Sequence, residues 1–163
     1  MKYFLTLLLV LPLMAIAQDC KLIKATDPYT KEKTISTGFI GMEGASLTID
    51  ATKQEIDMLF TVTGADKCYT DASVAAFFFV GTKIKLSQRN NGAMNCEGIF
   101  RFTLRNGASA PNVLRRLATQ KVEKIVFTGN NKKESIVTLT PEQQELLMRL
   151  SNCMMTEAPT LLQ

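Results

Sequence analysis

The segment from Cys68 to Cys96 constrains the fold most, because it holds two of the four cysteines and the most apolar run after the N-terminal segment. Residues 76–80 read Ala-Phe-Phe-Phe-Val, and a short apolar run between turn residues is typical of a strand buried on both faces. A buried helix has the same run and stays open as an alternative. Residues 83–87 then alternate Lys-Ile-Lys-Leu-Ser, which predicts a half-buried strand and an antiparallel hairpin turning at residues 80–83.

A second strand pattern follows this hairpin. Residues 88–95 are polar and include Asn91-Gly92, which predicts a loop or turn. From Cys96 onward the chain alternates again, with Phe100, Phe102 and Leu104 on one face of the expected strand. A disulfide from Cys68 to Cys96 would close this unit and contribute roughly 3–4 kcal/mol in the chain-entropy model.

Residues 1–17 have the pattern of a signal peptide. Lys2 gives a positive start, residues 4–16 form an apolar core, and Ala15-Ile16-Ala17 is a small-x-small cleavage site. The apolar run is short for a membrane span, and Cys20 lacks the small preceding residue of a lipid-anchor signal. We therefore expect cleavage before Gln18, a single disulfide-linked globular domain over residues 18–163, and a periplasmic or secreted location without a transmembrane segment.

Four cysteines in an exported chain favour two disulfides, and three pairings are possible. The preferred pairing is Cys68–Cys96 with Cys20–Cys153, because the second bridge would tie the N-terminal strand to the last helix. A zinc site is the competing interpretation, but no two cysteines form a close pair and the chain has no histidine.

The remaining patterns are short strands followed by helices. Strands are expected over residues 20–25, 33–40, 45–50, 56–63, 121–128 and 134–139. A short helix is expected after Pro111, and Thr140-Pro141-Glu142-Gln143 has the residues of a capped helix start. The tail from Glu157 is expected to fray.

This order of elements predicts an α+β fold. An antiparallel sheet of short strands would be covered on one face by a C-terminal helix–hairpin–helix segment. A β-sandwich with a helical cap is the alternative.

The lack of histidine removes several classes of catalytic site. Ser-His-Asp and Cys-His nucleophiles and His-ligated metals are excluded, and oxidised cysteines would not act as nucleophiles. No phosphate-binding glycine loop is present, so we expect no cofactor and no metal. A carboxylate pair for glycoside hydrolysis is the enzymatic alternative, and its candidates are Asp27, Asp50, Asp66, Asp71 and Glu97.

The formal net charge of +4 falls to +3 once Lys2 is removed with the signal peptide. Basic residues are dispersed, and pairs such as Lys31/Lys33 are interpreted as solvated turns and helix faces. Nucleic acid is therefore not an expected partner. The expected partner is a protein or a component of the cell envelope, and the sequence leaves the oligomeric state open.

Several features resemble a group of small exported bacterial proteins. They are Cys20 with the turn Asp27-Pro28-Tyr29-Thr30-Lys31, the Cys68/Cys96 pair around a hairpin, and a final helix with Cys153. The group has no assigned function to transfer. The resemblance implies an envelope protein with structural disulfides and no catalytic residue.

These observations predict an exported, soluble, non-enzymatic binding domain. Loops on a rigid sheet usually carry recognition, so we expect a binding surface at residues 88–95 and the 27–31 turn, with Tyr29, Arg89 and Asn91 as contacts. One alternative is an envelope hydrolase, which requires a pocket with two facing acids and a raised pKa on one of them. The other is an inhibitor of a secreted enzyme, which requires a rigid, protruding loop.

Overall fold

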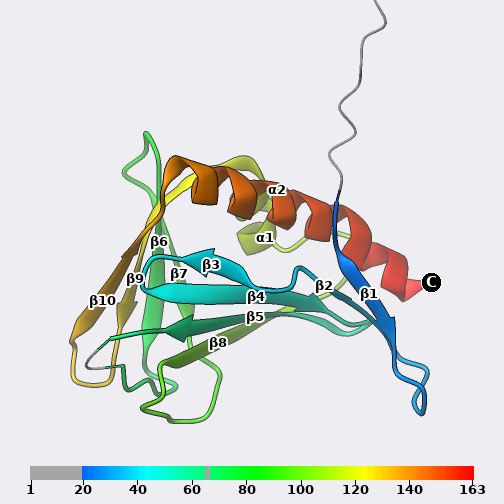
Figure 1. The fold of residues 1–163 in the computed structure, drawn as a ribbon, viewed down its shortest axis with the longest axis horizontal. Helices are drawn as coiled ribbons and strands as arrows, with labels where there is room; N and C mark the ends of the chain where they lie inside the picture. The colour runs from blue at the N-terminus through cyan, green and yellow to red at the C-terminus, as the bar shows by residue number, and fades with distance from the viewer. Residues whose placement is uncertain (1–19, 65–66) are drawn as a thin grey trace, which may run out of the picture.

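The computed structural model describes residues 20–64 and 67–163 (Figure 1). The regular structure of this part of the chain is mostly strands in two antiparallel sheets, and the helices lie toward the C-terminal end. The predicted signal peptide, the cleavage site before Gln18, and Asp66 lie outside the described residues.

The first sheet has the strand order β1-β2-β4-β5-β8, and β3 pairs with the beginning of β4. Its strands alternate as their sequences predict: β5 buries Ile56, Met58, Phe60 and Val62 and turns the residues between them outward. The strands are β1 (Ile23–Thr26), β2 (Lys33–Ser36), β3 (Ile40–Met42), β4 (Ala45–Ala51), β5 (Glu55–Val62) and β8 (Ile99–Arg105).

The second sheet has the order β10-β9-β6-β7. Its strands are β6 (Val74–Phe79), β7 (Lys85–Arg89), β9 (Val122–Thr128) and β10 (Glu134–Thr138). The predicted β6–β7 hairpin is confirmed, but its connection extends to Ile84, which is 59% exposed. The expected burial of the Phe run on both faces is wrong. Phe77 and Phe79 are fully buried, whereas Phe78 is half-buried on the outer face beneath the Lys124 ammonium group.

The two sheets pack against each other through aromatic side chains. The Phe60 ring of the first sheet lies 5.2 Å from the Phe127 ring and 6.1 Å from the Phe77 ring of the second, measured between centroids. The single sheet that we predicted is therefore wrong, because β6 turns its buried face toward β5 and β8 instead of extending their sheet. The sandwich alternative is closer to this arrangement.

Two helices, α1 (Asn112–Thr119) and α2 (Pro141–Glu157), pack against each other, and α2 crosses above both sheets in Figure 1. The predicted capping box at Thr140 and Gln143 forms. A separate C-terminal helix–hairpin–helix segment is not present as a unit, because β9 of the β9–β10 hairpin pairs with β6 and belongs to the second sheet. The expected fraying from Glu157 is also wrong, since residues Ala158–Leu162 form a 3₁₀ helix, η1, with Ala158 and Leu161 buried.

The structure pairs Cys20 with Cys153 and Cys68 with Cys96, the pairing that the sequence favoured. The first bridge joins the chain just before β1 to α2. The second joins the chain before β6 to the chain before β8.

Candidate functional site

The two segments of the predicted binding surface lie at opposite ends of the molecule. Figure 1 shows the β1–β2 turn at the lower right and the connection from β7 to β8 at the lower left. Tyr29 in the turn is 92% exposed, and Arg89, which ends β7, is also exposed. The structure therefore does not bring Tyr29 together with Arg89 and Asn91.

The β1–β2 turn is fixed by its first residue. Asp27 Oδ1 accepts hydrogen bonds from the backbone N–H groups of Thr30 at 2.7 Å and Tyr29 at 2.8 Å. These two bonds hold the pKa of the Asp27 carboxyl below its usual range. Asp27 is thus committed to the turn and is not a free catalytic acid.

The connection from β7 to β8 is held against the free edge of β8 by asparagine side chains. Buried Asn90 accepts from the Arg101 N–H at 2.8 Å and donates to the Thr70 carbonyl at 2.9 Å. Asn95 bonds both backbone groups of Ile99, donating at 2.8 Å and accepting at 3.0 Å. These side-chain amides bond to backbone groups of β8 that a neighbouring strand would otherwise pair with.

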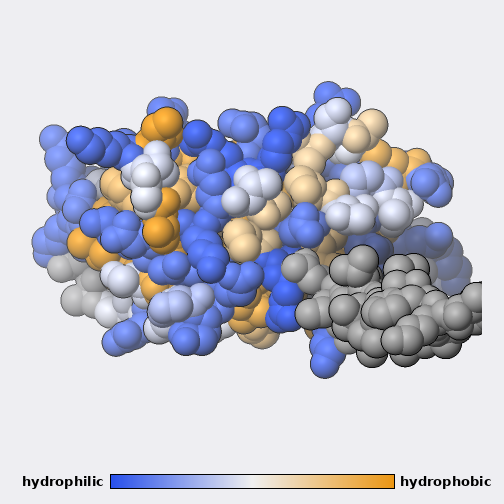
Figure 2. Space-filling model, turned by 90° about the horizontal axis from the view of Figure 1, so that it is seen from above, coloured by the Kyte–Doolittle hydropathy of each residue, from blue (hydrophilic) through white to orange (hydrophobic). Residues whose placement is uncertain are grey.

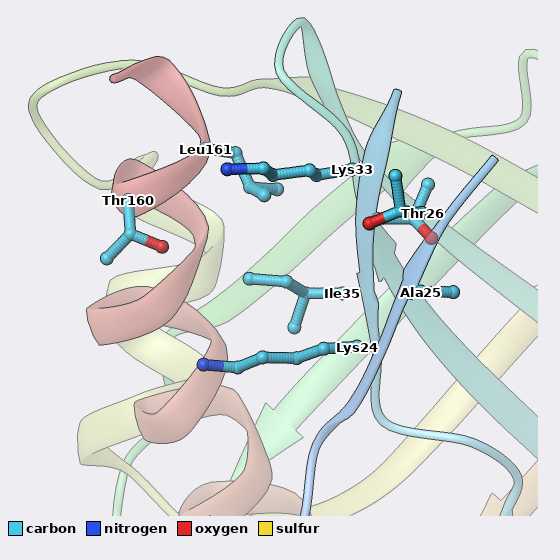
Figure 3. A pocket seen from close by; sticks show the side chains of 8 residues that line it. Lys24, Ala25, Thr26, Lys33, Ile35, Thr160 and Leu161 are labelled. Atoms are coloured by element: carbon cyan, nitrogen blue, oxygen red, sulfur yellow. The ribbon is translucent and has the colours of Figure 1, made fainter. Parts of the chain in front are cut away.

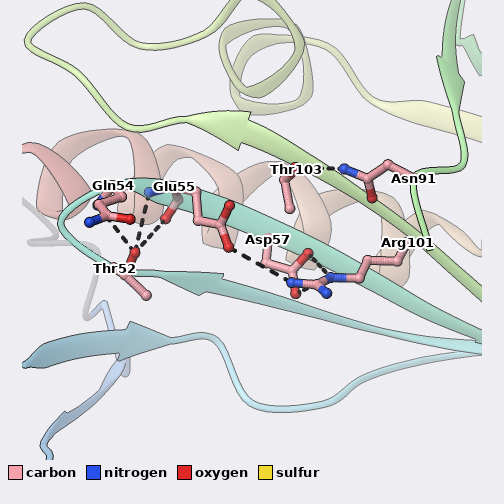
Figure 4. Close-up of polar contacts among 7 residues, drawn as sticks. All are labelled: Thr52, Gln54, Glu55, Asp57, Asn91, Arg101 and Thr103. Carbon is pink, nitrogen blue, oxygen red and sulfur yellow. Dashed lines mark hydrogen bonds and ion pairs between the residues drawn. The ribbon is translucent and has the colours of Figure 1, made fainter. Parts of the chain in front are cut away.

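Asn91 belongs to the same set of contacts. With its amide oriented to satisfy both polar atoms, it donates to the Arg101 carbonyl at 3.0 Å and accepts from the Thr103 N–H at 3.2 Å and the Thr103 hydroxyl. Figure 4 shows the Asn91 side chain directed at Thr103. The loop that we predicted as a contact surface is therefore attached to β8 at Asn90, Asn91 and Asn95, while Met94 between them is 68% exposed.

Arg101 organises the charged residues on the outer face of the first sheet (Figure 4). Its Nε donates to both Asp57 oxygens, at 2.7 and 2.9 Å, and its Nη2 lies 3.8 Å from Glu55. The Asp57 hydrogen bond raises the Arg101 pKa above its ordinary value. Asp50 stands directly opposite Asp57 in the β4–β5 register, so Arg101 also offsets the repulsion expected between them.

No described pocket suits a carboxylate-dependent hydrolase. Of four surface pockets in the described part of the chain, none is lined by more than one acidic side chain. Asp71 and Glu97 are exposed, and the acids with a shifted pKa, Asp27 and Glu142, are shifted downward. The pKa shifts of Asp27 and Glu142 are therefore opposite to the raised pKa that a general acid needs.

A different site lies between the β1–β2 hairpin and η1. It is a pocket of about 260 Å³, and Figure 3 shows Lys24, Lys33 and Ile35 extending from the hairpin toward the helix. Ile35, 2% exposed, lies between the two lysine side chains, and Leu161, 8% exposed, lies beside Lys33; together they form an apolar floor. The pairing of Lys24 with Ile35 in the β1–β2 register explains this arrangement, because cross-strand partners share a face.

A smaller pocket of about 200 Å³ adjoins the first, and the two share Lys33 and Leu161. Lys31 and Lys53 stand at its rim together with Glu32. We call the two together the lysine pocket, defined by Lys24, Lys31, Lys33 and Lys53 with Ile35 and Leu161.

The four lysines differ in their pairing. Lys24 Nζ lies 2.8 Å from Glu157 Oε2, and this ion pair spans the first pocket from β1 to the end of α2. Lys31, Lys33 and Lys53 make no ion pair with any residue that the structure describes. Lys33 is therefore the uncompensated cation that faces both pockets, and an anion there would gain a charge-assisted hydrogen bond.

Sequence reasoning missed this site for two reasons. Lys31 and Lys33 were interpreted as a solvated turn, and the residues that form η1 were expected to fray. The usable signal is an apolar residue two positions after a lysine on a strand, as in Lys33-Thr34-Ile35, because both side chains then face the same way. The opposite wall of the pocket is formed by η1, whose position against β2 cannot be predicted from the local sequence around Lys33.

Within residues 20–64 and 67–163, no group of three or more cysteine and acidic side chains is placed to hold a metal ion. None of the described helices has both the length and the apolar character needed to cross a bilayer. Comparison with protein-family models, curated proteins and solved structures finds no match.

Proposed function

We propose that this protein is a non-enzymatic binding domain, and that its ligand is a small organic anion with an apolar part, held in the lysine pocket. The observation that carries the proposal is Lys33, an unpaired cation beside the apolar floor of Ile35 and Leu161.

The chemistry of the pocket selects the ligand class. An ammonium group is a compact charge with three hydrogen-bond donors, and it lacks the fixed planar geometry of a guanidinium group. It can therefore bind a carboxylate, a sulfate or a phosphate with similar geometry. The apolar floor favours a ligand whose anionic group is attached to an alkyl or aromatic part. A volume of about 260 Å³ is below the usual range for a drug-sized ligand, so the pocket suits a small molecule or one end of a larger envelope component.

Two features support an exported location. Residues 1–17 carry the signal-peptide pattern, and both disulfides require an oxidising compartment such as the periplasm or the cell exterior. The non-enzymatic role is supported by the lack of histidine and by the oxidation of all four cysteines, which exclude Ser-His and Cys-His pairs.

The proposal is tested by titrating ¹⁵N-labelled protein with hexyl phosphate and recording amide chemical shifts. Saturable shifts are expected in β1, β2 and η1. Inorganic phosphate and hexanol, each carrying half of the recognition chemistry, should bind at least about tenfold more weakly, which corresponds to about 1.4 kcal/mol. Shifts confined to another surface, or no saturable binding of hexyl phosphate, hexyl sulfate or heptanoate, would overturn the proposal.

A further inference from the structure

Strand β10 has a free backbone edge. The Leu139 N–H bonds to the Glu123 carbonyl at 3.0 Å, and the Gly129 N–H bonds to the Lys133 carbonyl at 2.9 Å. Because backbone groups in an antiparallel pair alternate in direction, Glu134, Ile136 and Thr138 turn their N–H and C=O groups away from β9. Figure 1 shows β10 at the left-hand margin, and no described element pairs with its outer side.

Two other sheet edges in the described chain, those of β8 and β7, are protected. Asparagine side chains occupy the edge of β8, as described above. The edge of β7 carries Lys85 and Arg89, and charged residues on an edge discourage pairing with another strand. β10 reads Glu-Ser-Ile-Val-Thr, with one charged residue, Glu134, at its start and no lysine, proline or bulge, so its edge is less protected than those of β7 and β8.

An apolar row on the outer face of the second sheet ends at this edge. Ala76, Val126 and Ile136 are cross-strand partners on β6, β9 and β10, and Ile136 is 59% exposed. Figure 2, a view from above, shows single apolar residues scattered among polar ones at the left-hand end of the molecule. A hollow of about 330 Å³ lies between Ile136 and Thr138 of β10 and Glu43 and Gly44 of the β3–β4 turn.

We propose that β10 pairs antiparallel with β10 of a second copy of this chain, around a two-fold axis at Ile136. In this register the outward-facing residues meet as Glu134 with Thr138, Ile136 with Ile136 and Thr138 with Glu134. Each of these pairs exchanges two backbone hydrogen bonds. If the register shifts by two residues, one of the three outward-facing residues on each copy no longer has an outward-facing partner.

The side chains favour this occupant. The apolar row continues across the axis through the two Ile136 side chains, which are otherwise exposed at the edge. The Glu134 carboxylate of the second copy falls in the cross-strand row of Thr138 and Lys124, which brings opposite charges toward each other. The two four-stranded sheets would join into one continuous sheet, and the lysine pocket lies at the other end of each molecule.

Sedimentation velocity from low micromolar to near-millimolar concentration tests this pairing. An interface of one short strand from each copy is small, so we expect a weak dimer that dissociates on dilution. Ile136→Lys places two like charges at the axis and should leave only monomer at every concentration tested. Ser87→Lys adds the same charge at the edge of β7, in the same sheet, and should sediment like the wild type.

A second variant separates pairing from folding. Thr138→Pro removes an outward N–H that does not bond to β9, so it should abolish the dimer while the circular dichroism spectrum stays that of the folded protein. A wild-type protein that is monomeric throughout, or a dimer that survives Ile136→Lys, would overturn the proposal, and the former result would leave β10 open to a different strand partner. Neither result affects hexyl phosphate binding, because the two sites are apart.

Discussion

At the scale of single residues, Gly98 is the position with the least space for a side chain. Its φ is +85°, and a Cβ atom would lie 2.1 Å from the Val62 carbonyl oxygen, while Gly98 itself accepts a hydrogen bond from the Val62 N–H at 2.8 Å. Gly81 has a similar φ of +75° but nothing within 4 Å of the added atom. A comparison of the two glycines therefore separates the cost of a positive φ, which both share, from the cost of steric overlap, which only Gly98 has.

Gly98→Ala should therefore destabilise the fold far more than Gly81→Ala. The positive φ alone should lower the free energy of unfolding by about 1 kcal/mol in Gly81→Ala. In Gly98→Ala the Val62 carbonyl must also be displaced, so the loss in free energy of unfolding should be at least about 3 kcal/mol. Urea denaturation of both variants measures the difference, and equal losses would contradict the close approach seen here.

The Asp27 carboxylate gives a prediction about pH. Its pKa is lowered by the hydrogen bonds from Thr30 and Tyr29, so ionised Asp27 stabilises the folded state. This contribution is complete above the ordinary pKa of 3.8 and is lost as the pH falls through the lowered value. The melting temperature of the wild type should exceed that of Asp27→Asn at neutral pH, and the difference should be smaller at a pH well below 3.8. A difference of the same size at both pH values would contradict this assignment.

At the scale of elements, the asparagines of the β7–β8 connection explain how β8 remains a stable edge. Asn90→Ala would leave the Arg101 N–H and the Thr70 carbonyl without these partners in a buried site. We expect it to lower the free energy of unfolding by roughly 2–3 kcal/mol. Asn91→Ala, at an exposed position of the same loop, should cost less than about 1 kcal/mol. Thermal or urea denaturation compares them, and a larger loss in Asn91→Ala would refute the assigned roles.

The sequence was informative about elements and less so about their assembly. The alternation at Ile56, Met58 and Phe60 and the capping box at Thr140 predicted β5 and the start of α2, because local periodicity and capping chemistry decide both. It did not predict that the Phe77 face would pack onto β5 as a second sheet. A buried strand presents the same residues whether it extends a sheet or opposes one.

At the scale of the whole molecule, the Cys20–Cys153 disulfide connects the two walls of the lysine pocket. It joins the start of β1 to α2, near the Lys24–Glu157 ion pair and the beginning of η1. The candidate site was therefore hard to predict, because Lys33 and Leu161 meet only after the two ends of the chain are brought together. The predicted Cys20–Cys153 disulfide indicated that the two ends of the chain are close together, but it did not indicate which side chains would meet there.

Removing each disulfide separately should distinguish pocket assembly from general stability. Cys20→Ser with Cys153→Ser should lower the melting temperature and weaken hexyl phosphate binding roughly tenfold, because the pocket walls must then be ordered by the ligand. Cys68→Ser with Cys96→Ser should lower the melting temperature without changing the affinity of the folded protein. Equal affinities in the two double variants would show that the first bridge does not shape the pocket.

The most direct test is the affinity of the Lys33→Gln variant for hexyl phosphate, measured by isothermal titration calorimetry beside the wild type and Lys85→Gln. Lys85 is a matched exposed lysine on β7, outside the lysine pocket. Loss of a charged hydrogen-bond donor should weaken binding at least about tenfold in Lys33→Gln. Lys85→Gln should bind like the wild type. Equal affinity of Lys33→Gln and wild type, or no binding by any of the three, would contradict a ligand site at the lysine pocket.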